Sequence, residues 1–468
     1  MTDLAPLTRI GDPPRAAAPP PPVRRLPAPP ASPLLGTDLV AGVAALALVV
    51  VGTWARHGGV LALRGGGSAA WSSLASLTGL AASAVGLAGL VLVARPRSLE
   101  RRVGLDRLFV WHRYAGEAMA LLVAAHVATA FVAWSSDLGF AVALRELTGG
   151  QPYMAAATVG ALLVGVVTVT SLRSLRRRLA YETWWFVHLT AYLALALSFS
   201  HEIVLGTALA ADDVARALWI ALHVAVAALL VWRRWGATVA AAARPLRVVQ
   251  ARPVGPGTVE LVLAGRPLAH DRGEAGQFVL VRPLRAGLWW QAHPFSLSAA
   301  PTTAGFTLTV KDRGDASRAI AALPLGSRVA VEGPYGALGP ELLADRKVLF
   351  VAGGVGVAPV RALLQRLDTS HEPVVLYRAR STDDLVHLDD LRRLAGARGG
   401  RVLTLVGRTA TLAVRDPFGA TALTAAVPDL RDRVAVVCGP DALLHAARAG
   451  LRAAGLPPAA VHVETPWW

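Results

Sequence analysis

The sequence has a single cysteine, Cys438, in 468 residues. A lone thiol excludes a disulfide framework, a four-cysteine iron–sulfur cluster and a cysteine zinc site within the chain. Any redox centre must therefore be organic or held by histidine. Charged residues are also scarce, at 17% of the chain against 54% hydrophobic residues. This composition excludes a single water-soluble enzyme, so part of the chain is expected to lie in lipid.

The first 35 residues lack the apolar core of a signal peptide. They are rich in proline and alanine with scattered arginine, a composition typical of a disordered segment. We therefore expect residues 1–35 to form a disordered cytoplasmic tail. The first apolar stretch after it is expected to be a retained membrane anchor.

Six apolar stretches of spanning length follow this tail. A helix needs about 20 residues to cross the hydrocarbon core of a bilayer, and each stretch reaches that length. They are Leu35–Trp54, Trp71–Val93, Leu108–Trp134, Tyr153–Leu172, Trp184–Leu205 and Val214–Trp235. Residues 36–240 are therefore predicted to form a six-helix transmembrane bundle.

The chain has a net charge of +16, and eleven of its arginines lie in alternate loops of this bundle. By the positive-inside rule those loops face the cytoplasm, whereas the other loops carry acids such as Asp137, Asp212 and Asp213. We expect a multi-pass protein of the cell (plasma) membrane with both termini inside. We therefore attribute the basic charge to the orientation of the chain in the membrane and to contact with membrane lipid. No nucleic-acid partner is expected. The arginines concerned are Arg95, Arg97, Arg101, Arg102, Arg107, Arg173, Arg176, Arg177, Arg178, Arg233 and Arg234.

Four histidines lie on the third and fifth spans. His112 and His126 are fourteen residues apart, and His188 and His201 are thirteen apart. Each pair is thus separated by about 20 Å along its helix axis. Since both spans run in the same direction, His112 is level with His188, and His126 is level with His201. Two imidazoles that face each other can ligate a haem iron from both sides, which leaves no open position and suits electron transfer.

The thirteen-residue spacing is the difficult part of this geometry. Thirteen residues leave the second imidazole about 140° away from the face of the first, whereas fourteen leave it about 40° away. His188 and His201 therefore require either a local irregularity of the helix or an approach to a different haem edge.

Other polar groups in the bundle have simpler interpretations. An intramembrane histidine can merely hydrogen-bond a neighbouring helix, and we interpret His57 and His223 as structural in this sense. Arg113 is expected either to pair with a haem propionate or to extend its guanidinium to the interface. Glu117 is interpreted as a neutral or paired structural carboxyl, with a proton path as the alternative.

The pattern changes near Arg244, where short strand-like runs separated by glycine and proline begin. The first group predicts an antiparallel β-barrel over residues 244–340, and the second alternates with helical segments and predicts a parallel α/β domain over residues 341–468. The first group is Val259–Leu263, Phe278–Arg282, Phe306–Lys311 and Arg328–Val331. The second is Val348–Ala352, Val374–Arg378, Val402–Val406 and Val434–Cys438, with helices at Ala358–Leu367, Leu388–Leu394 and Ala442–Ala454.

Six spans, histidines spaced fourteen and thirteen apart, and then two soluble domains in this order resemble the ferric reductase and NADPH oxidase superfamily. The resemblance covers about residues 36–468. It implies two b-type haems, one held by His112 and His188 on the inner side and one held by His126 and His201 on the outer side. It also implies FAD in the first soluble domain and NADPH or NADH in the second.

Three motifs of the first soluble domain carry this resemblance. His293–Ser296 resembles the flavin motif of the family, which implies that the aromatic residue packs on the isoalloxazine and that Ser296 reaches its N5 edge. Lys311–Ser317 resembles the turn that binds the pyrophosphate, although an ordinary helix cap gives the same pattern. Glu332–Gly336 resembles the end of the barrel. The expected FAD-binding residues are His293, Pro294, Phe295, Ser296, Lys311, Gly314 and Ser317.

The second soluble domain carries two further motifs. Val351–Pro359 follows a strand and opens a helix, so its glycines allow a phosphate to approach the helix N-terminus. Cys438-Gly439-Pro440 resembles the motif at the nicotinamide end. The expected nicotinamide-binding residues are Gly353, Gly354, Gly356, Pro359, Arg378, Arg380, Gly439 and Pro440.

The resemblance also gives expected catalytic residues. They are Ser296, Cys438 near the hydride path, and Trp468, because related reductases place a terminal aromatic over the flavin. Arg378 and Arg380 either contact a 2′-phosphate, which favours NADPH, or are a solvated strand end.

A nicotinamide delivers two electrons as a hydride, whereas a haem iron accepts one at a time, and flavin can do both. The sequence therefore predicts electron transfer from cytoplasmic NAD(P)H through FAD and two haems to an acceptor outside, with ferric iron or oxygen as the main candidates. Ala130 occupies the position one turn beyond His126, where a histidine could stabilise oxygen. The alternatives are an electron-donating partner of a separate periplasmic or lipid-modifying enzyme, and a histidine-based transporter with a fused sensor.

Overall fold

The structure of the protein is a computed structural model. It describes residues 36–96, 99, 103, 105–265, 273–343, 346–408, 412 and 416–464. The expected tail at residues 1–35 and the terminal residue Trp468 lie outside these ranges.

Long apolar helices make up the first half of the described chain. They are α1 (Gly36–Arg56), α3 (Gly67–Ala94), α5 (Leu105–Leu138), α7 (Met154–Ser171), α9 (Tyr181–Leu205) and α11 (Asp213–Leu230). Five helical segments are long and apolar enough to cross a membrane, and α1 together with α2 (Gly59–Gly65) makes a sixth if this bent pair is one span. The two helices of the pair meet at 64°, next to Gly58, whose φ of 82° lies in the left-handed region.

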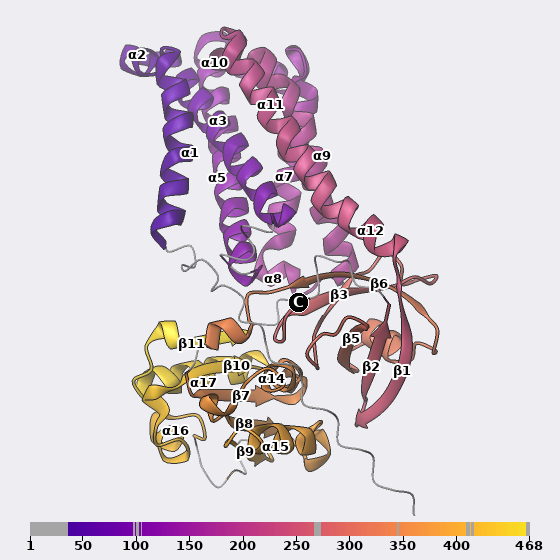
Figure 1. Ribbon diagram of the computed structural model, residues 1–468. Coiled ribbons are helices and arrows are strands. Elements are labelled where there is room, and N and C mark those ends of the chain that lie inside the picture. The colour runs from indigo at the N-terminus through magenta and orange to yellow at the C-terminus, as the bar shows by residue number, and fades with distance from the viewer. Residues whose placement is uncertain are drawn as a thin grey trace, which may run out of the picture. The chain divides into compact units, whose positions relative to one another are not determined.

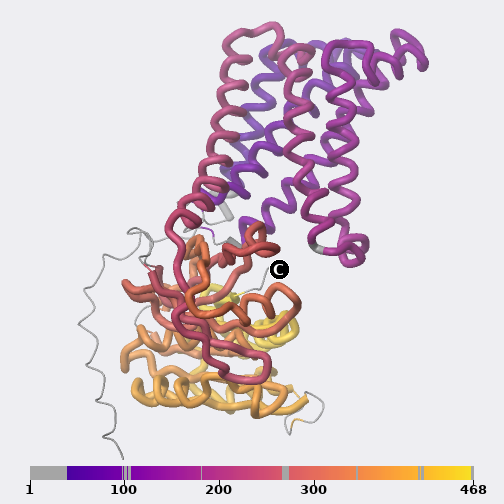
Figure 2. Tube along the Cα trace, turned by 90° about the vertical axis from the view of Figure 1, so that its right-hand side faces the viewer, coloured from indigo at the N-terminus to yellow at the C-terminus, as the bar shows by residue number. Residues whose placement is uncertain are grey.

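The helices of this half run beside one another in two perpendicular views (Figures 1 and 2). α3 packs along α5, and α7 packs along α9. α3 is the most enclosed of the spanning helices, and its Leu80 and Ala84 pack with Val50, Trp54 and Trp219 of α1 and α11. Shorter helical segments connect or extend the spans: α6 (Phe140–Arg145), η1 (Glu146–Gly150), α8 (Arg173–Arg176), α10 (Thr207–Ala210), η2 (Val231–Gly236) and α12 (Ala237–Ala243).

A six-stranded antiparallel sheet follows, in the order β4-β3-β6-β1-β2-β5. The interior is formed by alternate apolar side chains such as Val248, Leu261, Val279 and Leu308, all nearly fully buried. Its strands are β1 (Leu246–Gly255), β2 (Thr258–Ala264), β3 (Phe278–Pro283), β4 (His293–Ser296), β5 (Gly305–Lys311) and β6 (Arg328–Tyr335), and helix α13 (Asp315–Ala321) follows β5.

The predicted barrel is therefore only partly formed. The terminal strands β4 and β5 are joined by one isolated bridge, Leu297 to Leu308, rather than by a ladder. β4 has four residues, and its Pro294 has no backbone N–H to donate, so this strand has little capacity to pair with a second neighbour.

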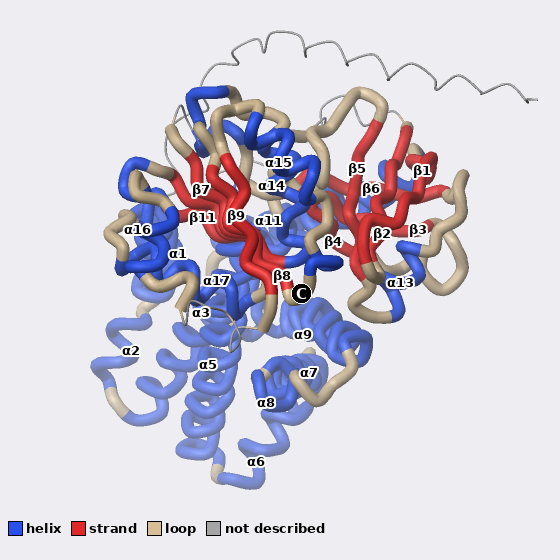
Figure 3. Tube along the Cα trace, turned by 90° about the horizontal axis from the view of Figure 1, so that it is seen from below, coloured by secondary structure: helices blue, strands red, loops and turns tan. Residues whose placement is uncertain are grey.

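The last part of the chain is a five-stranded parallel sheet in the order β11-β10-β7-β8-β9, with helices on both faces (Figure 3). α14 and α15 pack on one face, and α16 and α17 pack on the other. The strands are β7 (Val348–Gly353), β8 (Val374–Ala379), β9 (Arg401–Val406), β10 (Val434–Cys438) and β11 (Val461–Glu464). The helices are α14 (Val357–Leu364), α15 (Leu388–Gly396), α16 (Ala420–Ala426) and α17 (Asp441–Ala453).

This strand order creates a switch point between β7 and β10. From β7 the chain proceeds to β8 and β9 on one side, and then returns to β10 and β11 on the other. In open parallel sheets, ligands bind beyond the carboxyl ends of the strands at such a point. Gly353 and Cys438 are the last residues of β7 and β10. The parallel α/β domain is confirmed, while the sequence reading missed β1, β11 and α16.

Candidate functional site

The four intramembrane histidines meet in the two pairs expected from their depths. The ring centroids of His112 on α5 and His188 on α9 lie 6.0 Å apart, and those of His126 and His201 lie 6.1 Å apart. Two metal–imidazole bonds of about 2 Å each would put the ligand nitrogens about 4 Å apart, with the ring centres somewhat farther. Both pairs are therefore compatible with a metal between the rings.

The donor set suits a haem rather than a bare metal ion. Within the part of the chain that the structure describes, no group of three or more histidine, cysteine, aspartate or glutamate side chains could hold an ion. A haem iron already has four porphyrin nitrogens and needs only two axial ligands, which one imidazole pair provides.

The imidazoles of α5 are oriented by backbone carbonyls of α3. Nδ1 of His112 lies 3.2 Å from the carbonyl oxygen of Gly89, and Nδ1 of His126 lies 2.8 Å from that of Ala75. A carbonyl can only accept, so Nδ1 carries the proton and Nε2 keeps its lone pair. This tautomer is the one that can ligate a metal through Nε2, and the hydrogen bond fixes the ring plane.

The imidazoles of α9 are held differently. Nδ1 of His188 and Nδ1 of His201 are buried and have no hydrogen-bond partner among the described residues. His188 instead stacks on Trp184, one turn earlier, with ring centroids 5.0 Å apart and an angle of 24° between the rings. The α9 rings therefore lack the backbone anchors that hold the α5 rings.

The helix irregularity considered for the thirteen-residue spacing does not occur. α9 is one continuous α-helix over Tyr181–Leu205. Its two imidazoles therefore reach α5 from different sides of the helix, and the interplanar angles differ accordingly, 80° for the pair with His188 and 43° for the pair with His201.

Two glycines of α3 lie against the α5 histidines. A Cβ at Gly79 would lie 2.9 Å from Nδ1 of His126, a separation that folded proteins essentially never show. A Cβ at Gly89 would lie 3.7 Å from Nδ1 of His112, which is ordinary van der Waals contact. Only the first position requires the absence of a side chain.

The sequence reading missed Glu202, the residue after His201. Its carboxylate accepts hydrogen bonds from Ser83 Oγ at 2.9 Å and Trp219 Nε1 at 3.0 Å, and His223 Nε2 lies 3.9 Å away. An acidic residue inside an apolar span was the available signal, because such a group needs partners in lipid.

The remaining polar groups of the bundle have local partners. His57 bonds Thr53 O and Asp212, and His223 Nδ1 bonds Trp219 O. Arg113 forms a 3.7 Å ion pair with Glu117 one turn away on the same helix. Glu117 thus has an ion-pair partner, and its structural role stays a prediction.

The flavin motif is strand β4, which pairs with β3 from Val281 opposite His293 to Phe278 opposite Ser296. His293, Pro294, Phe295 and Ser296 are all half-buried. His293 Nε2 lies 3.0 Å from Gln291 Oε1, and burial lowers the pKa of His293, so its ring is neutral at pH 7. Trp290, just before this motif, contacts Phe186 of α9 with ring centroids 6.0 Å apart.

The segment Lys311–Ser317, expected to bind the pyrophosphate, contains a backbone conformation that glycine favours. Gly314 has φ 141°, and Asp315 begins α13, so Ser317 lies in the first turn of this helix. The Ser317 hydroxyl accepts from the Arg313 N–H at 2.7 Å and therefore closes the turn. Lys311 forms a 2.9 Å ion pair with Asp384 of the parallel domain. Its ammonium thus has a carboxylate partner from the other domain.

The two motifs of the nicotinamide domain lie together at the switch point. A Cβ on Gly356 would lie 2.5 Å from the carbonyl oxygen of Cys438, and one on Gly439 would lie 3.2 Å from Gly353 N. Gly354 has φ 54°, Pro359 lies in the first turn of α14, and Pro440 precedes α17. Close backbone approach therefore explains the glycines at 356 and 439, whereas a Cβ on Gly353 would meet the Leu443 side chain at 2.5 Å.

The other predicted residues of this domain are placed as follows. Cys438 is fully buried at the end of β10, and burial raises the pKa of its thiol. The Arg378 guanidinium donates to the carbonyls of Leu405, at 3.1 Å, and Ala379. Arg380 lies just beyond β8 and is exposed. Trp468 lies outside the described residues.

Three family models match successive parts of the chain. The ferric reductase like transmembrane component matches residues 78–199, the FAD-binding domain matches residues 246–338, and the oxidoreductase NAD-binding domain matches residues 350–449.

Individual relatives match parts of the chain. The ferredoxin reductase component of 3-ketosteroid-9-alpha-monooxygenase from Mycolicibacterium smegmatis is 32% identical over 43% of this chain and 58% of its own length. Ferredoxin–NADP reductase B from Sorangium cellulosum is 30% identical over 47% of this chain and 95% of its own length. Ferric reduction oxidase 7 from Arabidopsis thaliana is 30% identical over 26% of this chain, so that the chain covers only 18% of that protein.

The helices and these matches define a membrane protein of the oxidoreductase class, with an FAD-binding domain and an NAD-binding domain after its transmembrane part. The chain belongs to the ferric reductase and NADPH oxidase superfamily, in which a ferric reductase-like transmembrane domain is fused to a ferredoxin-reductase-type module.

Proposed function

We propose that this protein moves electrons from cytoplasmic NAD(P)H through FAD and two b-type haems to an acceptor on the outer face of the membrane. The observation that carries the proposal is the meeting of the four intramembrane imidazoles in two pairs, at 6.0 and 6.1 Å. The pairs are fourteen residues apart on α5, about 20 Å along the helix, so two haems would conduct electrons across much of the hydrocarbon core.

Each cofactor has a candidate site. His112 and His188 would hold the inner haem, and His126 and His201 the outer one. FAD would lie along β4, with Ser296 at its reactive edge, and the nicotinamide would enter at the switch point beside Cys438. When bound, a haem would supply a one-electron carrier, and the protein would hold it through the two imidazoles of each pair. The arginine-rich loops favour the cytoplasmic placement of the soluble domains.

The acceptor is proposed to be ferric iron or oxygen. The Arabidopsis relative is named a ferric reduction oxidase, which favours iron. Ala130, one turn beyond His126, provides no hydrogen-bonding side chain that could stabilise reduced oxygen. Iron is therefore the first acceptor to test.

A second candidate is electron donation to a separate enzyme. It is favoured by the similarity of the soluble half to a protein named as the reductase component of a monooxygenase. In that case reduced protein in membranes would reoxidise only when the partner enzyme is present, and not with ferric chelates.

The test uses the full chain, purified in detergent after expression with haem supply. We expect two haems and one FAD per chain, and reduced b-type spectra after addition of NADPH or NADH under anaerobic conditions. His126→Leu and His201→Leu should each lower the haem content from two to one and abolish ferric-chelate reduction, while flavin reduction continues. His223→Leu, which removes a membrane histidine outside both pairs, should keep both haems. A wild-type preparation without haem absorbance would overturn the proposal.

A further inference from the structure

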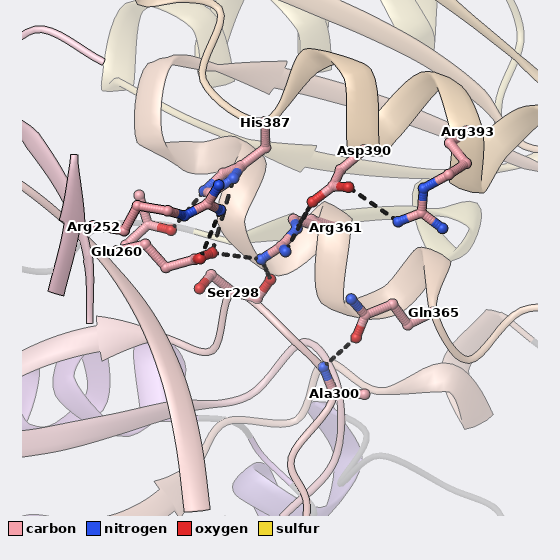
Figure 4. A network of polar contacts seen from close by, with 10 residues as sticks. Arg252, Glu260, Ser298, Ala300, Arg361, Gln365, His387, Asp390 and Arg393 are labelled. Carbon is pink, nitrogen blue, oxygen red and sulfur yellow. Dashed lines mark hydrogen bonds and ion pairs between the residues drawn. The ribbon is translucent and has the colours of Figure 1, made fainter. Parts of the chain in front are cut away.

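A buried polar network joins the antiparallel sheet to the parallel α/β domain, with Arg361 of α14 at its centre (Figure 4). Nη1 of Arg361 donates to Glu260 Oε2 at 2.8 Å and to the Ser298 carbonyl at 2.9 Å. Its Nε and Nη2 lie 3.0 and 2.9 Å from Asp390 Oδ2. One guanidinium therefore contacts β2, the segment after β4, and α15.

The network is shielded from water, which makes its geometry energetically important. The side chains of Arg361 and Glu260 are only 12% and 7% exposed. A buried charge is stable only when hydrogen bonds replace its lost hydration, and the planar guanidinium supplies several donors in fixed directions. A shift of one domain against the other would separate Arg361 from Glu260 and from the Ser298 carbonyl, although Arg252 would stay with Glu260 and Asp390 with Arg361. The two bonds that cross between the domains therefore favour a single arrangement.

Both ends of the network lie beside cofactor segments. Ser298 is two residues after Ser296, at the end of the flavin strand. Arg361 is on the helix that begins directly after the glycine loop Gly354–Gly356. One turn farther along the chain, the Gln365 side chain accepts from the Ala300 N–H at 2.7 Å. Two contacts therefore tie the segment that follows the flavin strand to the segment that follows the nucleotide loop.

We propose that Arg361 is a positioning residue that sets the distance and tilt between the nicotinamide ring and the flavin. This inference rests on the nicotinamide-to-FAD step of the proposed function. In that step a C–H bond of the reduced nicotinamide breaks with both electrons, a hydride is added to FAD, and the nicotinamide leaves oxidised. Such a transfer requires reacting atoms within about 3–3.5 Å, and a misplacement of about 1 Å can cost about a hundredfold in rate.

Arg393 provides a matched control. It is also an arginine bonded to Asp390, at 3.0 Å, but it is 68% exposed and makes this bond within α15 alone. Arg361→Gln and Arg393→Gln therefore remove the same charge and one partner of the same carboxylate, and only the first breaks the contact between domains. Arg361→Lys keeps the positive charge and provides a second variant if the glutamine variant folds poorly.

The experiment is anaerobic stopped-flow reduction of the FAD in the full-length protein, at saturating NADPH and NADH. For Arg361→Gln and Arg361→Lys we expect unchanged FAD content, a limiting rate of flavin reduction lowered tenfold to a hundredfold, and a weaker long-wavelength charge-transfer band between nicotinamide and flavin. With nicotinamide deuterated at C4, the isotope effect should approach its full value because hydride transfer becomes rate-limiting. Arg393→Gln should stay within twofold of wild type.

The outcomes separate this inference from the proposed function. An unchanged limiting rate and charge-transfer band in a folded, FAD-loaded Arg361→Lys protein would overturn the positioning role. Loss of FAD without any change in the rate per bound flavin would also overturn it, because the role would then be structural. If neither nicotinamide reduces the wild-type flavin, the proposed function fails instead.

Discussion

In the helical half, His112 and His126 each donate to a backbone carbonyl of α3, whereas in the soluble half Arg361 is held by two carboxylates. Lipid explains the difference. A charged partner inside the bilayer is expensive, while a helix carbonyl needs no added charge and has a fixed position. The soluble half can use ion pairs because water surrounds the domains. The functional side chains are thus positioned by backbone carbonyls and glycines in the helical half, and by ion pairs in the soluble half.

The strongest test of this comparison is Gly79→Ala. The new Cβ would meet the His126 ring at 2.9 Å, so the ring must turn away from its ligand position. We expect occupancy of the His126/His201 haem to fall tenfold to a hundredfold, as is typical when the support of a metal ligand is lost. Haem content and reduced-minus-oxidised spectra measure the effect.

Two other glycines serve as controls for this substitution. Gly89→Ala places its Cβ at an ordinary 3.7 Å from His112, and Gly165→Ala meets nothing within 4 Å. Both variants should retain two haems. Equal haem loss in all three would mean that helix packing in general, and not the contact with His126, determines haem binding.

Glu202 is an exception to the comparison, since it is a carboxyl enclosed between helices of the helical half. Glu202→Leu would leave the Trp219 N–H and the Ser83 hydroxyl without their acceptor. We expect this variant to lose about 1–3 kcal/mol of stability, because buried polar groups without partners are costly. Thermal unfolding in detergent, followed by circular dichroism, measures the loss.

Glu202→Gln is the matched variant, because its amide oxygen can still accept. It should recover most of the lost stability. If the leucine and glutamine variants unfold at the same temperature as wild type, the hydrogen bonds of Glu202 do not stabilise the bundle.

The smallest expected effect concerns His387, beside the Arg361 network. Its Nε2 lies 2.9 Å from Thr309 Oγ1, and burial, with the charge of Arg361, lowers its pKa from 6.5 to about 4. Because the unfolded chain binds the proton first, His387 favours the folded state above pH 6.5, and this contribution is lost as the pH falls toward 4. The nearby charges of Glu260, Asp390 and Arg252 modify the effect.

His387→Asn should therefore flatten the pH dependence of stability between pH 6.5 and 4. Asparagine tolerates the left-handed backbone at this position, where φ is 60°. The midpoint of flavin release on heating, measured at several pH values, reports the effect. Parallel pH profiles for the variant and wild type would exclude His387 as a source of acid sensitivity.

Much of this architecture follows from sequence pattern. The spans and the histidine pairs could be predicted because helix periodicity and bilayer thickness relate residue number to depth. The short helix α2 and its bend from α1 were not predicted, because Gly58 follows Arg56 and His57 in the loop expected between the first two spans. The missing closure of the barrel depends on β4, whose four residues include a proline.

The Arg361 network could not be predicted at all. Arg361 and Glu260 are 101 residues apart, and neither belongs to a recognisable motif. Their contact depends on how two domains dock, which no local pattern encodes. It could also not be predicted whether α9 is one continuous helix. Residue spacing gives the angle between two side chains on a helix, but not the direction from which each side chain approaches its partner.

Because α3 packs antiparallel to α5, the two hydrogen bonds between these helices have the same residue spacing on both. The anchoring carbonyls, Ala75 and Gly89, are fourteen residues apart, as are the imidazoles of His126 and His112 that bond to them. A one-residue insertion in α3 between these carbonyls would shift one anchor by about 1.5 Å and rotate it by about 100° relative to the other. The segment of α3 between Ala75 and Gly89 therefore cannot gain or lose a single residue without misplacing one of the two anchors.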